Sequence, residues 1–207
     1  MKKSALTILA LLLAGLMATG STCTKESELG AIVAAVVSDT FSTSGYTEAT
    51  DADTAVADVG AAILDAVDAV DLEDIDSVRV TGVCYGVDSY AGTERTRTGS
   101  ITVDSNTLAT FNITTNSSTA GCSGDGKLNL DSAGIAYVNT QLNNFLDAVK
   151  AAGAPKNSGG TPTLEFMYIA QWASSPAPSS GDPDNFTWHV DLKFQVYYSP
   201  TVDLPDI

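Results

Sequence analysis

The chain has 207 residues, with 10 Lys and Arg against 25 Asp and Glu, and a formal net charge of −15 at pH 7. A field of this sign repels the phosphates of nucleic acids, which excludes nucleic acid as a partner. The single histidine excludes metal sites that need several histidine ligands.

The first 22 residues have the three-part layout of a secretory signal peptide. Lys2 and Lys3 form a basic head, residues 4–17 are apolar, and small residues follow. A membrane-spanning helix needs roughly 20 apolar residues, so this stretch is too short for a retained span. We therefore expect residues 1–22 to be a signal peptide and the protein to be exported.

Two cleavage sites after this segment are compatible with the sequence. Ala18 and Gly20 suit a cut that leaves Ser21 as the first residue, whereas a cut before Cys23 would expose its thiol for lipidation. The basic head, the apolar run, the cysteine and a polar tether over 23–30 resemble the layout of bacterial lipoproteins. This resemblance implies a lipid anchor on Cys23. The three residues before it read Gly-Ser-Thr, where that family usually has Leu-Ala-Gly.

The cysteine count bears on the same question. Cys84 lies in an apolar, strand-like run and Cys122 lies in a loop rich in Gly and Ser, and the two can pair in an oxidising compartment. Such a disulfide leaves Cys23 as the odd cysteine, which a lipid would consume. The alternative is that Cys84 is a buried free thiol.

Two elements are expected early in the mature chain. The segment 31–41 is rich in β-branched residues and favours a strand. The segment 51–70 has apolar residues at spacings of three and four and carboxylates at its start, in Asp51 and Asp53. It predicts an amphipathic helix.

Three strands are expected next. Apolar residues alternate over 78–87, and Gly82 shifts the phase of the alternation, which predicts a β-bulge. Strands over 97–103 and 108–115 follow, joined by a polar turn.

The C-terminal part predicts one helix and two long strands. The helix runs from about 132 to 152, with an apolar stripe on one side and Gly153 at its stop. Apolar residues recur at period two over 163–172 and 186–198. Because a single loop rich in Ser, Pro and Gly joins these strands, we expect them to pair as an antiparallel hairpin.

Strands outnumber helices, and no repeat or strong linker divides residues 31–207, so we expect a single β-rich domain. The predicted fold class is mainly β (α+β): an antiparallel β-sandwich or sheet with two amphipathic helices packed on one face or end.

An acidic run between the first helix and the strand at 78 is a weak calcium candidate, because carboxylate oxygens suit this hard cation. The alternative is a solvated connection, since the EF-hand pattern with its glycine is absent. The candidate ligands are Asp71, Glu73, Asp74 and Asp76.

His189 alternates on the polar face of its strand, with Asp191 two residues on. No nucleophile elbow, phosphate loop or dinucleotide fingerprint accompanies it, so we expect a solvent-facing histidine and no cofactor. Trp172 and Trp188 fall in phase with the apolar faces of their strands and are expected in the core.

These observations predict an exported bacterial envelope protein that acts as a non-catalytic structural or binding module. It would sit at the outer membrane or cell surface if Cys23 carries a lipid, and otherwise in the periplasm or outside the cell. Its partners would be the membrane, through that lipid, and an envelope protein or surface polymer. Two alternatives stay open: a carrier of a lipid or other hydrophobic ligand in a cavity between helices and sheet, and a hydrolase that uses His189 with a nearby Ser and Asp191.

Overall fold

The computed structural model describes residues 36–46, 50–66, 72–153 and 162–198. The predicted signal peptide, the tether and Cys23 therefore lie outside the described residues. The account of the fold below concerns the described ranges only.

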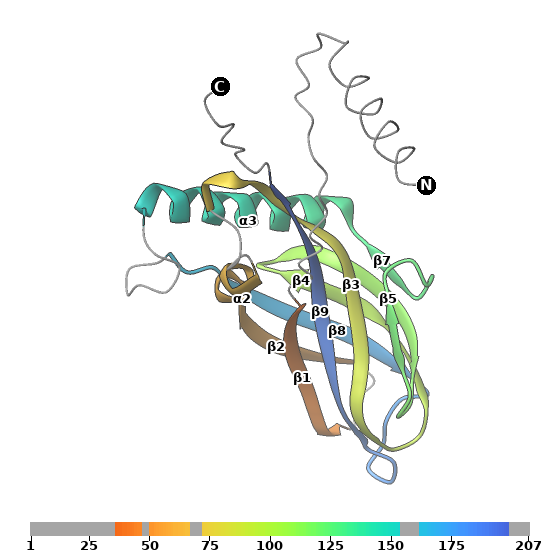
Figure 1. Ribbon diagram of the computed structural model, residues 1–207. Coiled ribbons are helices and arrows are strands. Elements are labelled where there is room, and N and C mark those ends of the chain that lie inside the picture. The colour runs from red at the N-terminus through yellow and green to blue at the C-terminus, as the bar shows by residue number, and fades with distance from the viewer. Residues whose placement is uncertain (1–35, 47–49, 67–71, 154–161, 199–207) are drawn as a thin grey trace, which may run out of the picture.

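Two antiparallel sheets form a sandwich (Figure 1), with strand order β1-β9-β3-β6 in the four-stranded sheet and β2-β8-β4-β5-β7 in the five-stranded sheet. The strands are β1 (Val36–Tyr46), β2 (Thr50–Asp58), β3 (Ile75–Ala91), β4 (Arg95–Val103), β5 (Asn106–Thr115), β6 (Ala120–Cys122), β7 (Leu128–Leu130), β8 (Glu165–Ser175) and β9 (Asp184–Tyr198). The helices are α2 (Val59–Ala66), the 3₁₀ turn η1 (Leu72–Asp74) and α3 (Ser132–Ala152).

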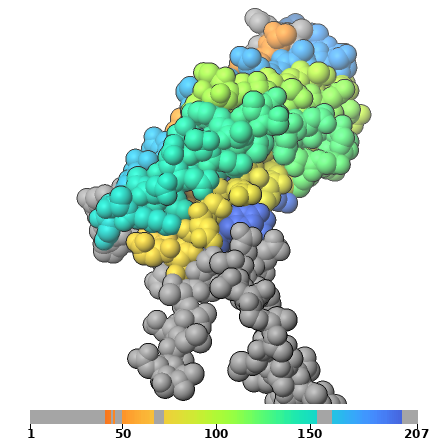
Figure 2. All heavy atoms as spheres, turned by 90° about the horizontal axis from the view of Figure 1, so that it is seen from above, coloured from red at the N-terminus to blue at the C-terminus, as the bar shows by residue number. Residues whose placement is uncertain are grey.

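The two longer helices pack against strands of both sheets. Helix α2 contacts β1 and β8, and α3 contacts β3, β4 and β5. Figure 2 looks down on α3, which lies between the beginning of β3 and the strands β4 and β5. The predicted fold class, a mainly β sandwich with two helices packed against it, is confirmed.

The core lies between the inner faces of the sheets and is rich in aromatic rings. Trp188 occupies its centre, with ring centroids 5.1 Å from Phe41, 5.8 Å from Trp172 and 6.0 Å from Phe111. Trp172 and Trp188 are only 5% and 6% exposed. The prediction that both tryptophans pack in the core is confirmed, and large rings at these separations contribute much of the buried apolar area.

Helix α3 begins and ends where the sequence predicts. The Asp131 carboxylate accepts hydrogen bonds from the backbone N–H groups of Ala133 and Gly134, which caps the first turn. Gly153 ends the helix in the left-handed conformation, at φ 56°, where glycine avoids the strain of a side chain. The buried stripe comprises Val138, Leu142, Phe145, Leu146 and Val149.

The same helix covers part of the edge of β3. Asn143 Oδ1 accepts from the Val78 N–H at 3.0 Å and its Nδ2 donates to the Val78 carbonyl at 2.9 Å, while Asn139 Oδ1 accepts from the Val80 N–H at 2.7 Å. These two amides make hydrogen bonds that a neighbouring strand would otherwise make with β3. They satisfy backbone groups that would otherwise invite pairing with another chain.

The prediction of a helix over 51–70 is wrong for its first half. Residues 50–58 form β2, which pairs with β8 along its whole length, and only Val59–Ala66 is helical. The strand alternates, with Ala52, Thr54 and Val56 facing outward. The apolar residues from Val56 onward fit the spacing of a helix as well as that of a strand. Pairing with β8 decides in favour of the strand over 50–58. Residues 67–70 of the predicted helix lie outside the described residues.

The predicted hairpin between the last two strands is also wrong. Strand β8 lies between β2 and β4 in one sheet, and β9 lies between β1 and β3 in the other. The connecting loop therefore crosses from sheet to sheet. Period-two alternation identifies the buried face of each strand but carries no information about which strand lies beside it.

The remaining strand predictions are confirmed with longer boundaries. β3, β4 and β5 contain the strands expected over 78–87, 97–103 and 108–115. The register between β3 and β9 shifts between Val80 and Gly82, which is the predicted bulge. The first strand, expected over 31–41, runs over Val36–Tyr46, and residues 31–35 lie outside the described part.

Gly134 allows α3 to touch β5 and gives a test of this packing. A Cβ added there would lie 1.8 Å from the Thr107 carbonyl oxygen. We predict that Gly134→Ala lowers the free energy of unfolding by about 1–3 kcal/mol, because the backbones must separate. Alanine is the better helix former by about 1 kcal/mol, so without this close contact the substitution would instead stabilise the helix. Urea unfolding would contradict the packing if the variant were more stable than the parent. The control Ala136→Gly, on the exposed side of α3, should cost about 1 kcal/mol through helix propensity alone.

Candidate functional site

A buried charge cluster joins the sheets at one end of the sandwich. Asp184, the first residue of β9, accepts a hydrogen bond from the Arg97 guanidinium, and its Oδ1 lies 3.6 Å from Arg95 Nε. Arg95, Arg97 and Asp184 are 1%, 2% and 1% exposed. The Arg97 guanidinium also stacks over the Phe186 ring, 4.1 Å from its centroid. The buried carboxylate thus lies between two buried guanidiniums, while the Nε atoms of both arginines have no hydrogen-bond partner among the described residues.

The Arg95 side chain also holds the loop that crosses between the sheets. Its guanidinium donates to the carbonyl oxygens of Pro176 at 3.0 Å and Asp182 at 2.8 Å, and to the Asp182 carboxylate at 2.6 Å. Hydrogen bonding from Thr93, followed by the hydrogen bond and charge of the Arg95 guanidinium, holds the pKa of Asp182 below its usual value. The cluster was missed in the sequence, although Arg95 and Arg97 share the inward phase of Ile101 along β4.

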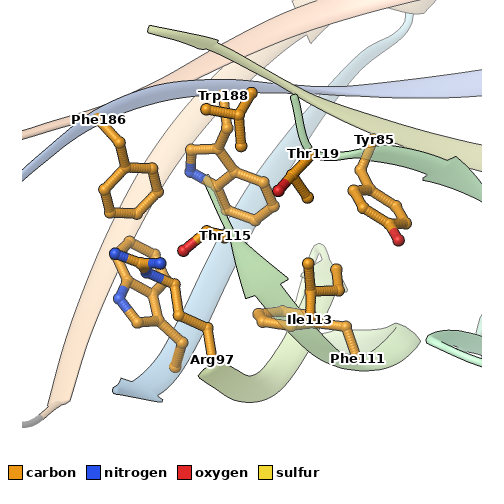
Figure 3. A pocket seen from close by; sticks show the side chains of 10 residues that line it. Tyr85, Arg97, Phe111, Ile113, Thr115, Thr119, Phe186 and Trp188 are labelled. Atoms are coloured by element: carbon orange, nitrogen blue, oxygen red, sulfur yellow. The ribbon is translucent and has the colours of Figure 1, made fainter. Parts of the chain in front are cut away.

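A small apolar cavity lies beside this cluster, between the sheets (Figure 3). Its volume is about 20 Å³, and its walls include Tyr85, Phe111, Ile113, Trp172 and Trp188. That space suits one water-sized molecule. The carrier hypothesis requires an elongated cavity between helices and sheet, and neither α2 nor α3 contributes to this one.

His189 lies on the outer face of the four-stranded sheet. Its Nδ1 is 2.7 Å from Asp88 Oδ1 and its Nε2 is 3.8 Å from Asp191 Oδ2. The imidazole lies over Gly86, where an added Cβ would be 2.5 Å from the ring. The partners that the structure gives for the ring are therefore two carboxylates, whereas the hydrolase hypothesis requires a hydroxyl nucleophile beside it.

Cys84 and Cys122 form a disulfide, as predicted. The two residues are direct cross-strand partners in β3 and β6, and the bond fastens β6 to the edge of β3. Lys193 Nζ lies 3.6 Å from Cys122 Sγ. The bond is consistent with an oxidising, extracytoplasmic compartment.

Asp125 organises the loop between β6 and β7. Its Oδ1 accepts from the backbone N–H groups of Lys127 at 2.7 Å and Leu128 at 3.2 Å, and its Oδ2 accepts from the Tyr85 hydroxyl at 3.0 Å. Burial opposes ionisation of Asp125, but these hydrogen bonds outweigh it and lower the pKa of the carboxyl. Burial and the nearby Asp125 carboxylate raise the pKa of Tyr85 to about 12. Both carboxylate oxygens are thus used to hold the loop.

The described residues of the acidic run are not grouped as ligands of a metal ion. Glu73 and Asp74 lie in η1 and Asp76 lies at the start of β3, while Asp71 is outside the described residues. Within the described ranges, no three acidic, histidine or cysteine side chains are grouped as ligands of a metal ion. The calcium assignment stays a prediction.

The outer face of the five-stranded sheet is a candidate binding surface that sequence reasoning missed. We call it the neutral face; it consists of every second residue of 52–56, 167–173, 96–102 and 110–114, and none of these residues is charged. The outward phase continues to Asp58 and Glu165, an exposed cross-strand pair that gives this face an acidic end. Threonine predominates. The outward phase of β4, with Thr96, Thr98, Ser100 and Thr102, was the signal that could have revealed it.

A shallow depression of about 580 Å³ lies at one end of the neutral face. Thr98, Ser100 and Gln171 line it, together with the small residues Ala52 and Gly99. Asp51 is the charged residue among those lining it, and its carboxylate accepts a hydrogen bond from the Ala52 N–H at 2.6 Å. The lining can donate and accept hydrogen bonds but carries no catalytic pair.

Comparison with family models, curated proteins and solved structures finds no match for this chain. Among the helices that the structure describes, none combines the length and apolar character required to cross a bilayer.

The disulfide gives a stability test. It closes a loop with a sequence separation of 38 residues, and its removal in Cys84→Ala/Cys122→Ala should lower the free energy of unfolding by roughly 2–4 kcal/mol. Urea unfolding measures this, and Cys23→Ser is the control that should leave stability unchanged. Equal stability of the double variant and the parent, with both thiols open to alkylation in the folded parent, would contradict the pairing.

Proposed function

We propose that this protein is an exported lipoprotein of a bacterial envelope and acts as a non-catalytic structural or binding module. The observation that carries the proposal is the Cys84–Cys122 disulfide. It consumes two of the three cysteines and leaves Cys23, which follows the basic head and apolar run of the N-terminus, as the odd one. An odd cysteine in an exported chain calls for a modification or a partner, and a lipid on the first mature residue meets that need.

The proposed location is the outer membrane or the cell surface. The lipid would hold the chain at the membrane, and the tether 23–30 would separate the sandwich from the lipid head groups. The strongly negative charge supports this arrangement, because it keeps the folded part away from an anionic membrane surface. The proposed partner is an envelope protein or a surface polymer.

The non-catalytic role is supported by where the chemically capable side chains lie. His189 is held between two carboxylates on a sheet face, and the buried arginines are engaged with Asp184. Neither arrangement offers a nucleophile with a base. A carrier role has less support, because the cavity of about 20 Å³ is far below the size of a lipid chain.

The intact mass of the protein from membrane fractions tests the proposal. We predict a chain that begins at Cys23 with the added mass of a diacylglyceryl group. The variant Cys23→Ser should lose this increment and leave the membrane fraction, because the proposed anchor is covalent.

A different intact mass would contradict the proposal. A species that begins at Ser21 and carries an unmodified Cys23 thiol would contradict the anchor. Unchanged urea unfolding of Cys23→Ser would show that any loss from the membrane reflects the anchor and not the fold.

A further inference from the structure

The depression on the neutral face is formed by small residues around one long polar side chain. Gln171 of β8 is exposed and lies between its direct cross-strand partners, Ala52 of β2 and Ser100 of β4. Gly99 also lines the depression and adds no side chain, because a Cβ there would lie 1.9 Å from the Gln171 carbonyl oxygen. These small residues leave the hollow of about 580 Å³ open beside the Gln171 amide.

Hydroxyl groups line the depression on both sides of β8. Thr50 of β2 and Thr98 of β4 lie in the neighbouring row of the face, both opposite Ala173 of β8. Two strand spacings of about 4.8 Å separate the two strands that carry these hydroxyls. Within the described part of the chain, the side chains of Thr98, Ser100 and Gln171 form no hydrogen bond with the protein. Their donors and acceptors are therefore available to a ligand.

This lining matches a ligand that offers hydroxyl groups and no charge. The exposed side chains of the lining are polar or small, so an apolar ligand would gain little burial. An anionic ligand would be repelled by Asp51 in the depression and by Asp58 and Glu165 at the acidic end of the face. An ammonium group only donates hydrogen bonds and would leave the Gln171 N–H groups without an acceptor. A sugar hydroxyl both donates and accepts, and so satisfies hydroxyl, amide and carboxylate groups alike.

We propose that this depression binds a segment of an uncharged polysaccharide. The inference rests on the proposed function, in which the partner is a surface polymer, and it names the chemistry of that polymer. The depression is shallow and open, so a chain of sugars can lie across β2, β8 and β4 without inserting an end. Trp172 belongs to the lining but is only 5% exposed, so ring stacking adds little. Because binding then depends on hydrogen bonds, we expect a dissociation constant of about 1 mM for one bound segment.

Native electrophoresis of the exported chain carrying Cys23→Ser, in gels that contain dextran, mannan or galactan, tests the proposal. At least one of these uncharged polysaccharides should retard the chain, and the dependence of mobility on its concentration gives the dissociation constant. Thr98→Val removes one hydroxyl at constant shape and should weaken binding about fivefold. Gln171→Leu removes the whole amide and should weaken binding at least about tenfold.

The matched control is Thr187→Val, which removes a hydroxyl from the outer face of the other sheet and should leave the retardation unchanged. Absence of retardation in all three gels would overturn the proposal, as would equal retardation of the parent and Gln171→Leu. Retardation only by glycol chitosan, a cationic polymer, would overturn it too, because the net charge of the chain explains that result. Since Cys23→Ser removes the proposed anchor, these outcomes are independent of the intact mass that tests the lipid.

Discussion

The packing of the two sheets depends on one buried carboxylate, that of Asp184. It begins β9 in the four-stranded sheet and meets Arg95 and Arg97 of β4 in the five-stranded sheet. Charges this far from solvent are tolerated only when they are paired and hydrogen-bonded, so the two sheets must meet in the register that brings these groups together. Arg95 also binds the Pro176 carbonyl, which directs the chain from β8 across to β9. The position of the last strand and its two neighbours, β1 and β3, follows from this cluster.

A sandwich closed in this way has little room inside for a ligand. Aromatic rings around Trp188 occupy the space between the sheets, and the asparagines of α3 bond to the edge of β3. Recognition of other molecules is therefore expected on the outer faces. One face carries a histidine between carboxylates and a disulfide, and the other is rich in threonine and has its charges, Asp58 and Glu165, at one end. A proposed lipid at Cys23 assigns anchoring to the N-terminus, separate from the faces of the sandwich.

Sequence reasoning was most successful where the signal is local. Helix α3 was predicted from its apolar stripe and Gly153, and the disulfide was one of the two alternatives that counting the cysteines left open. It failed for β2, where the residues fit two periodicities and pairing with β8 decides between them. It failed again for the partners of β8 and β9, because alternation encodes a buried face and not a neighbour. The neutral face and the pairing of Asp184 with two arginines depend on contacts between distant strands, which no short window of sequence contains.

The stability of Asp184→Asn tests the central claim most directly. This isosteric change removes the charge that two buried guanidiniums share, and urea unfolding should show a loss of roughly 3–5 kcal/mol. The matched change Asp182→Asn also removes a hydrogen-bonded partner of Arg95, but at a carboxylate whose side chain is 39% exposed, so it should cost less than Asp184→Asn, roughly 1–2 kcal/mol. A large loss at residue 184 beside a small loss at residue 182 is the predicted result. Equal and small losses at both positions would contradict the view that the buried carboxylate holds the two sheets together.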